Sequence, residues 1–251
     1  DRLIGRADSL LDRAARTGDL STVLMFGGSP SVWTRLREAY APRPGSEADR
    51  ILEQLEATAR INEAWTGGER WRSNRLRVDL LKKNFLRQRR DADPAARVLV
   101  KLGGFHAVRG RTPNNTYDVG NLLSELARVE SEASGEGASG DGVSSVGTGD
   151  RSFHLLALGG PGGERAAIDP EGLGVRRVPT HLSDPPPSLR PFATAALPDR
   201  WTLFDLRPLR PLADAGDLGK LPPDLERRIF GFDAVLVLVG STASDALLEP
   251  R

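Results

Sequence analysis

His106 is the residue whose type and position best suit chemistry, in a chain that has only three histidines. An apolar run at 98–102 leads into Gly103 and Gly104, and the histidine follows shortly after. If the run is a strand of an open α/β sheet, His106 lies at the carboxyl end of that strand, where ligands gather and glycines let the backbone approach them. An imidazole there can act as a general acid or base, because the ordinary pKa of histidine lies near neutrality. The alternative is a histidine that ends the strand by hydrogen bonding.

Polar residues that could bind a substrate follow soon after this histidine. Arg109 could bind a carboxylate or stabilise developing oxyanion charge, although a loop arginine in an arginine-rich chain is more often simply solvated. Asp118 and Asn121 fall at the start of an expected helix. Capping of that helix, with Asn115 or Thr116 as the N-cap, would explain much of this polar cluster without any ligand.

Arg77 and Asn84 lie upstream, on one face of an expected long helix. Together with Leu81 they occupy positions i, i+4 and i+7, which share a helical face. An arginine and an asparagine beside core leucines indicate one of two arrangements. Either the face borders a polar cleft, or the two side chains lie at the rim with their polar ends in water.

Other motifs give little support to a different chemistry. The chain has no H-E-x-x-H zinc motif and no P-loop. A literal G-x-G-x-x-G at 135–140 has no expected strand before it and no helix after it, so its context does not fit dinucleotide binding. His154 falls inside an expected strand, where a core or sheet-face role is more frequent than catalysis. His181 falls in a loop and has no evident partner.

The elements that must position these residues are helices in the first third of the chain and strands after it. Helical spacing of apolar residues predicts helices at 46–65, with Ser46 as the N-cap, and at 69–90. Shorter helical patterns occur at 117–129 and 222–230. Apolar runs of the kind found in parallel sheets predict strands at 98–102, 152–158, 174–178, 201–207 and 233–239. We therefore expect the α/β fold class, with a mostly parallel sheet and flanking helices.

We expect one α/β domain over residues 1–251, interrupted by a flexible loop at 130–150. This loop is rich in glycine, serine and acidic residues and has nothing to bury. The chain starts at Asp1 with no methionine. We interpret this start as processing or as N-terminal truncation.

Bulk composition bears on several classes of function. Hydrophobic residues make up 39%, charged residues 27%, and the formal net charge is +1, so we expect neither a disordered chain nor a nucleic-acid partner. The chain has no cysteine, which excludes disulfides, thiolate metal sites and a cysteine nucleophile. No apolar run approaches the ~20 residues that span a bilayer, and no signal segment opens the chain. We expect a soluble protein with a small-molecule substrate; compartment and oligomeric state stay open.

The order of several short motifs resembles a known superfamily. The motifs are, in order, Arg77-x-x-x-Leu81-x-x-Asn84, Gly103-x-x-His106, Asp118-x-Gly120-Asn121, Phe204 to Arg207, and Phe232 to Val239. This succession is similar to the C-terminal portion of the erythromycin esterase-like superfamily, which also includes haem-binding iron-regulated lipoproteins. The Gly-Glu-x-x-His motif of the superfamily, which lies nearer the N-terminus, does not occur in this chain. We therefore expect the chain to begin downstream of that motif.

The resemblance implies an α/β fold with a deep cleft. It also implies hydrolysis of an ester or related small molecule without a metal, in which histidines and a glutamate activate a water and arginines stabilise the oxyanion. Carried over, His106 is the catalytic base or the residue that orients the water, and Arg77 lines the cleft. The candidate substrate-binding residues are Arg109, Asn84, Asp118 and Asn121.

Two alternatives remain beside the hydrolase. In the first, the protein is not an enzyme and binds haem or another small ligand through His106, since neutral imidazole is a common axial ligand. In the second, the chain is a fragment that neither catalyses nor binds tightly. The leading hypothesis needs no cofactor and no metal.

Overall fold

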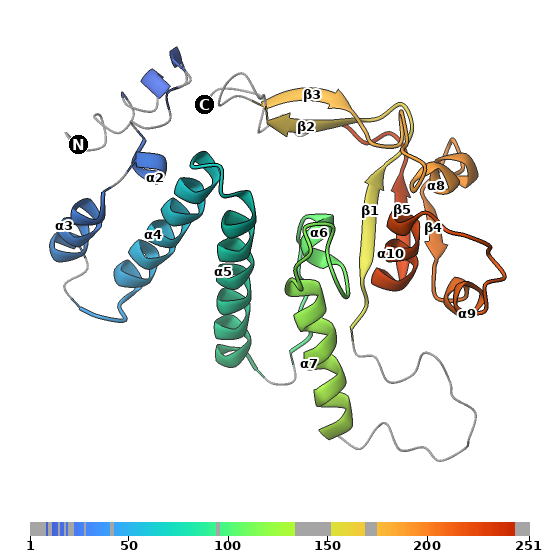
Figure 1. Cartoon of the computed structure of the whole chain (residues 1–251), viewed down its shortest axis with the longest axis horizontal. Helices are drawn as coiled ribbons and strands as arrows, with labels where there is room; N and C mark the ends of the chain where they lie inside the picture. The colour runs from blue at the N-terminus through green and yellow to red at the C-terminus, as the bar shows by residue number, and fades with distance from the viewer. Residues whose placement is uncertain are drawn as a thin grey trace. The chain divides into compact units, whose positions relative to one another are not determined.

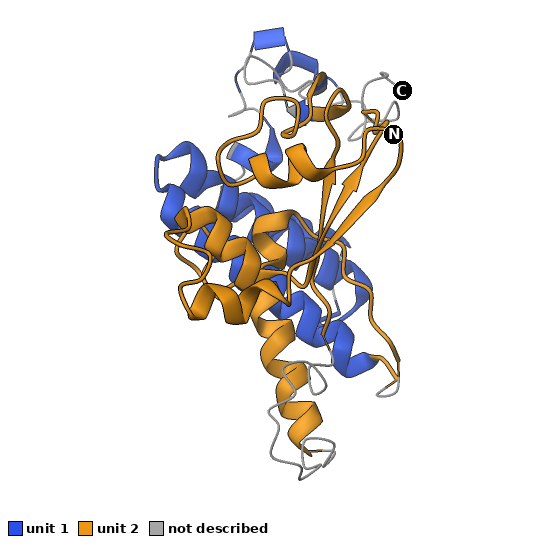
Figure 2. Ribbon diagram, turned by 90° about the vertical axis from the view of Figure 1, so that its right-hand side faces the viewer, with its two compact units in different colours: residues 1–91, 167–176 blue, residues 92–166, 177–251 orange. Residues whose placement is uncertain are grey.

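The computed structural model divides the chain into two compact units (Figure 2). Unit 1 comprises residues 1–91 and 167–176, and unit 2 comprises residues 92–166 and 177–251. The expectation of one domain over residues 1–251 stays a prediction, because two compact units can fold together as one domain. The structure describes residues 9, 12–14, 16–17, 19, 23–27, 29–40, 43–93, 96–133, 152–168 and 175–243.

Unit 1 contains the two long helices that the sequence predicts. Its helices are α2 (Leu24–Gly27), α3 (Pro30–Tyr40), α4 (Glu47–Thr66) and α5 (Arg70–Asp91), as Figure 1 shows. Ser46 is the N-cap of α4, and its hydroxyl accepts the backbone N–H of Asp49 at 3.2 Å. The predictions of helices at 46–65 and 69–90 are confirmed, since both depend on local capping and spacing signals.

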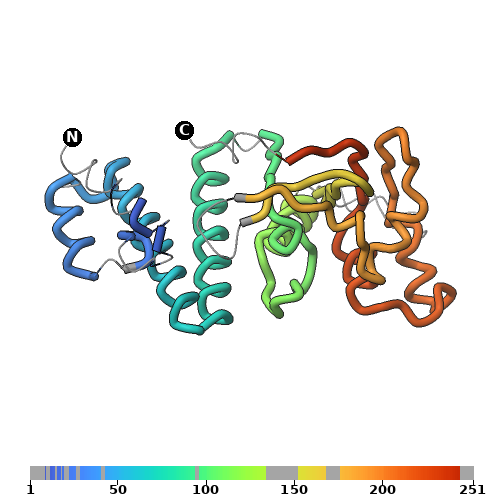
Figure 3. The backbone as a smooth tube through the Cα atoms, turned by 90° about the horizontal axis from the view of Figure 1, so that it is seen from above, coloured from blue at the N-terminus to red at the C-terminus, as the bar shows by residue number. Residues whose placement is uncertain are grey.

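Helices α4 and α5 lie side by side within unit 1 (Figures 1 and 3). The chain reverses between them at Gly67 and Gly68, and Gly68 has φ +81°, a conformation that glycine adopts without steric cost. Ile61 of α4 and Val78 of α5 are both buried. The buried hydroxyl of Ser73 donates to the carbonyl of Ile61 at 2.9 Å, so this polar group has a partner inside the helix pair.

Unit 2 contains a three-stranded mixed sheet. Its strands, in spatial order, are β1 (Leu155–Gly159), β5 (Ala234–Leu238) and β4 (Thr202–Asp205). β1 pairs with β5 in parallel, with Leu156 opposite Val235, whereas β4 pairs with β5 antiparallel, with Phe204 opposite the same valine. The α/β class is confirmed in this coarse sense, but the expectation of a mostly parallel sheet is wrong. An apolar run predicts that a strand is buried; it does not determine the direction of its neighbours.

A second, two-stranded sheet pairs β2 (Glu164–Ile168) with β3 (Val175–Pro179). The sequence predicts β3 at 174–178. It does not predict β2, whose arginine and alanines form no continuous apolar run. Gly162 precedes β2 with φ +75°, so a tight turn leads from β1 into the second sheet.

The predicted strand at 98–102 is wrong. The described residues from 96 to 103 form no strand, and Leu99 is 96% exposed. The chain then passes directly into the short helix α6 (Gly104–Ala107), which carries His106. An apolar run becomes a strand only where a neighbouring backbone offers hydrogen-bonding groups, and within the described residues no strand pairs with this one.

The remaining helices of unit 2 include the two that the sequence predicts at 117–129 and 222–230. They are α7 (Val119–Ala133), α8 (Arg190–Ala195), α9 (Leu209–Asp214) and α10 (Pro223–Gly231). The first part of the loop predicted at 130–150 belongs to α7, up to residue 133, and residues 134–150 lie outside the described residues. Among the helices that the structure describes, none is both long and apolar enough to cross a bilayer.

The core of unit 2 forms around the central strand β5. Val235 and Val237 are fully buried there. The rings of Phe192 and Phe204 meet edge to face with centroids 5.5 Å apart. The other buried members of this core are Val108, Leu182, Leu189, Leu206 and Phe232. Segments spread along the chain from Val108 to Phe232 thus contribute to this core.

Val235→Ala is expected to lower the free energy of unfolding by about 2 kcal/mol, because it removes two methyl groups from a side chain that is 0% exposed. Val129→Ala on α7 is the matched control, since that valine is 52% exposed and its loss should cost less than about 0.5 kcal/mol. Urea unfolding followed by circular dichroism measures both. Equal destabilisation would contradict the central position of β5.

Candidate functional site

His106 and Asp118 form a close polar pair in unit 2. The Nδ1 atom of His106, on α6, lies 2.7 Å from Oδ2 of Asp118. Asp118 immediately precedes α7 and is 2% exposed, and its Oδ1 accepts the backbone N–H of Val119 at 2.7 Å. One carboxylate oxygen therefore binds the first turn of α7 while the other holds the imidazole. The sequence suggested the two residues separately, and the structure brings them together.

This geometry fixes the position of the proton on the ring. An ionised carboxylate only accepts hydrogen bonds, so Nδ1 of His106 carries the hydrogen and donates it to Asp118. In the neutral ring, Nε2 is then the nitrogen with an available lone pair. An imidazole oriented in this way can take a proton from a water or hydroxyl that reaches Nε2.

Close packing of α7 against α6 holds the pair in place. A Cβ added at Gly120 would lie 2.3 Å from the carbonyl carbon and oxygen of Ala107, so only glycine fits at this point. The next residue, Asn121, accepts the backbone N–H of Gly110 at 3.0 Å through Oδ1. The predicted substrate contact Asn121 therefore fastens the segment after α6 to α7.

His106 lines a cavity of about 600 Å³ within unit 2. This volume suits a small organic molecule. The wall is largely apolar, with side chains from β1, α6 and the loops beside α8 and α10: Phe105, Leu156, Leu158, Leu189 and Phe232. The ionisable residues that line it with His106 are His181, Asp224, Arg227 and Arg228.

Partial removal from water lowers the pKa of two of these groups. Burial, together with the positive charge of Arg165, lowers the pKa of His181, which favours the neutral ring near pH 7. Burial also lowers the pKa of Arg228, an effect that Asp224 opposes and Arg227 reinforces. A guanidinium still stays protonated at neutral pH, so Arg228 brings a positive charge to the cavity wall.

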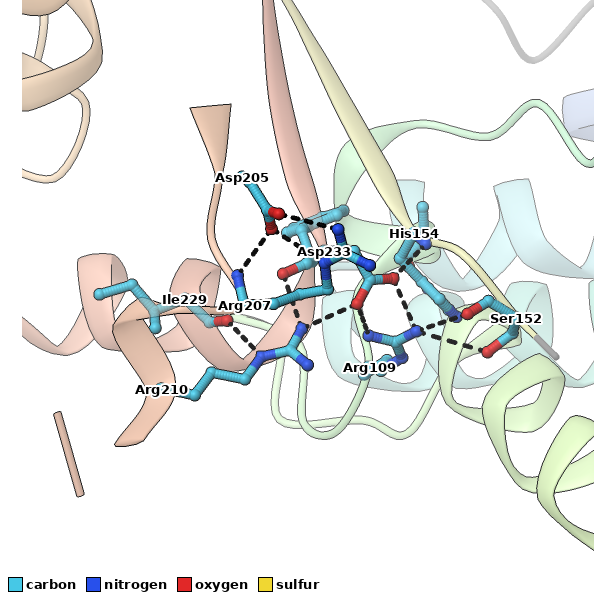
Figure 4. A network of polar contacts seen from close by, with 10 residues as sticks. Arg109, Ser152, His154, Asp205, Arg207, Arg210, Ile229 and Asp233 are labelled. Carbon is cyan, nitrogen blue, oxygen red and sulfur yellow. Dashed lines mark hydrogen bonds and ion pairs between the residues drawn. The ribbon is translucent and has the colours of Figure 1, made fainter. Parts of the chain in front are cut away.

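A second polar network surrounds Asp233, just before β5 (Figure 4). Arg109 donates to both of its carboxylate oxygens at 2.7 Å, Arg210 donates to Oδ1 at 3.0 Å, and the backbone N–H of His154 donates to Oδ2 at 2.7 Å. Burial would raise the pKa of Asp233, but these hydrogen bonds and the charge of Arg109 outweigh it and hold the pKa below its ordinary value. Arg109, a predicted substrate contact, thus has a structural partner.

The other predicted site residues belong to unit 1. Asn84 donates from Nδ2 to Oε1 of Gln54 at 2.6 Å, and its Oδ1 accepts from Arg87 at 3.1 Å. The bond to Gln54 connects α5 to α4, whereas the bond from Arg87 lies within α5. Arg77 is exposed on α5. The roles predicted for Arg77 and Asn84 stay predictions.

The sequence does not predict the cationic part of the cavity. It offers no evident partner for His181, and it predicts 222–230 only as a helix. One signal was available: Leu225, Arg228 and Ile229 share a face of α10 by their i, i+3 and i+4 spacing. Leu225 packs on the core, so an arginine on its face must approach the interior of unit 2.

No family model, curated protein or solved structure matches this chain. Searched over the described residues, the structure contains no group of three or more His, Cys, Asp or Glu side chains arranged to hold a metal ion.

Gly120→Ala is expected to destabilise unit 2 by about 3 kcal/mol, because its Cβ would collide with the backbone of Ala107 and not with a movable side chain. Gly103→Ala is the control. Its Cβ would lie 3.8 Å from the His106 ring, which is ordinary contact, so the cost should stay below about 1 kcal/mol. Thermal and urea unfolding measure both variants. A fully tolerated Gly120→Ala would refute the close approach of α7 to α6.

Asp233→Asn should destabilise the protein by about 3 kcal/mol at pH 7, because it leaves two partly buried guanidiniums without a carboxylate. The native pKa of Asp233 is depressed, so its contribution is fully present above the unfolded pKa and is lost as pH falls through the folded pKa. The difference in unfolding free energy between wild type and Asp233→Asn should therefore shrink below about pH 4. Urea unfolding at pH 7, 4 and 3 tests this. A difference that is constant with pH would contradict it.

Proposed function

We propose that unit 2 is a hydrolase that acts on an ester or related small molecule, with His106 as the general base. The observation that carries the proposal is the 2.7 Å contact between His106 Nδ1 and the buried Asp118, at the wall of a cavity of about 600 Å³. Asp118 is a positioning residue in this scheme, because it orients the ring and does not touch the substrate. The motif order that resembles the erythromycin esterase-like superfamily supports the same chemistry.

The reaction uses the free lone pair of His106. Nε2 takes a proton from a water molecule while the water oxygen attacks the carbonyl carbon of the ester. The tetrahedral intermediate then collapses, the bond to the leaving oxygen breaks, and the imidazolium returns its proton to that oxygen. The ionised Asp118 stabilises the imidazolium between the two steps.

The cavity provides a second requirement of the reaction, a donor for the carbonyl oxygen that becomes negative. His181 lines the same cavity, and burial lowers its pKa, so its neutral ring can donate an N–H without competing for the proton. The apolar wall strengthens such a hydrogen bond because it lowers the local dielectric constant. We assign His181 to this position as a substrate contact.

His106→Ala should lower kcat/KM for p-nitrophenyl butyrate by about 100-fold or more, since it removes the general base. Asp118→Asn should also lower it, because an amide in that position no longer fixes the tautomer of the ring. His154→Ala is the control: its Nδ1 donates to the carbonyl of Ala107, and it does not line the cavity. Release of p-nitrophenol is followed by absorbance, with thermal melts to confirm folding. Equal loss in His106→Ala and His154→Ala would refute the proposal.

Binding of haem through His106, without catalysis, is the second candidate. The same contact favours it, because a ligating histidine commonly donates its other N–H to a carboxylate. Addition of haem should then produce a shifted Soret band that His106→Ala removes. An unchanged spectrum of haem in the presence of the full chain would eliminate this candidate.

A further inference from the structure

The cavity wall carries positive charge that the proposed hydrolysis does not use. α10 contributes Arg227, Arg228 and Asp224, and among the described residues that line the cavity this aspartate is the one acidic residue. Asp118 does not present a free carboxylate to the cavity, because it is only 2% exposed and both of its carboxylate oxygens accept hydrogen bonds. Two guanidiniums and one carboxylate leave a net positive wall.

The excess charge belongs to Arg228. Arg227 forms an ion pair with the carboxylate of Asp224. Arg228 instead donates to the backbone carbonyl of Asp224 at 2.7 Å, which occupies one of its five N–H groups. Within the described part of the chain, no carboxylate forms an ion pair with Arg228.

Arg228 is also half-buried, which makes an unneutralised charge costly. A carboxylate is the planar anion that a guanidinium binds with two parallel hydrogen bonds. A bound carboxylate would offset the cost of burial and complete the hydrogen bonding of the guanidinium. The charge therefore favours an anionic ligand over a neutral one.

The rest of the wall specifies the other part of the ligand. Leu156 and Leu158 of β1 line the cavity, together with Leu189, Phe105 and Phe232. Such a surface binds an alkyl or aromatic chain and gives little to a sugar or a peptide backbone. The cavity thus combines one cationic group with an apolar surface.

We propose that the cavity binds small molecules that consist of an apolar chain and a carboxylate, with the carboxylate on Arg228. The statement about the substrate rests on the proposed hydrolysis: the substrate is then an ester whose acyl chain ends in a carboxylate. Binding itself does not require hydrolysis, so the two proposals can be tested separately.

The first test compares octanoate with octanamide, which share the alkyl chain and differ in charge. Isothermal titration calorimetry with the full 251-residue chain should give a dissociation constant at least about tenfold lower for octanoate. Octanoate and octanamide that bind equally would overturn the proposal.

Variants assign the preference to Arg228. Arg228→Gln should weaken octanoate by about tenfold or more and leave octanamide unchanged, and Arg228→Lys should restore part of the difference. Arg200→Gln is the matched control, since Arg200 is exposed, is paired with Asp199 and does not line the cavity. Asp224→Asn should tighten octanoate, because it removes the acidic residue of the wall. Unchanged octanoate affinity in Arg228→Gln, or an equal loss in Arg200→Gln, would overturn the assignment.

Kinetics separate this proposal from the hydrolase. The p-nitrophenyl half-ester of glutarate should have a higher kcat/KM than p-nitrophenyl valerate, and Arg228→Gln should abolish the preference. Hydrolysis that depends on His106 but shows no preference for the half-ester refutes the carboxylate site alone. Octanoate binding that depends on Arg228, with both esters unaffected by His106→Ala, refutes the hydrolase alone.

Discussion

The buried carboxylate of Asp233 fixes the segments from which unit 2 is built. It accepts hydrogen bonds from Arg109 after α6, from Arg210 on α9 and from the backbone of His154 before β1. Its hydrogen bond with Arg109 joins positions 124 residues apart in the chain. Because Arg109 and His106 share one short stretch of backbone, this ion pair also determines where the imidazole stands relative to the sheet. The site therefore depends on an interaction outside its own cavity.

Local signals were sufficient for the helices and insufficient for the sheet. Ser46 and the apolar spacing after it predict α4 correctly, because a cap and a helical face are set by residues close in sequence. Pairing between strands is decided by distant segments. The run at 98–102 has the composition of a strand, yet it finds no partner among the described residues and exposes Leu99. The sequence predicts β4 as a strand but does not predict its antiparallel direction.

In the candidate site, too, some features could be predicted from local sequence and others depend on the fold. The position of His106 after two glycines, and that of Asp118 before a helix, could be read locally, whereas their 2.7 Å contact depends on the packing of α7 on α6. Arg109 looked like a substrate contact because nothing in the sequence connects it to Asp233. Arg228 lies far along the chain from His106, and only the fold makes both line one cavity.

The two hydrogen bonds of Asp118 couple the folding of unit 2 to its chemistry. One oxygen stabilises the start of α7 and the other orients His106, so a single side chain serves both tasks. An asparagine can keep only one of its two atoms as an acceptor, and a glutamate would displace both. At many enzyme sites a substitution that lowers activity raises stability. At this position we expect a substitution to lower both. A more stable variant of this protein must therefore be sought at positions away from the start of α7.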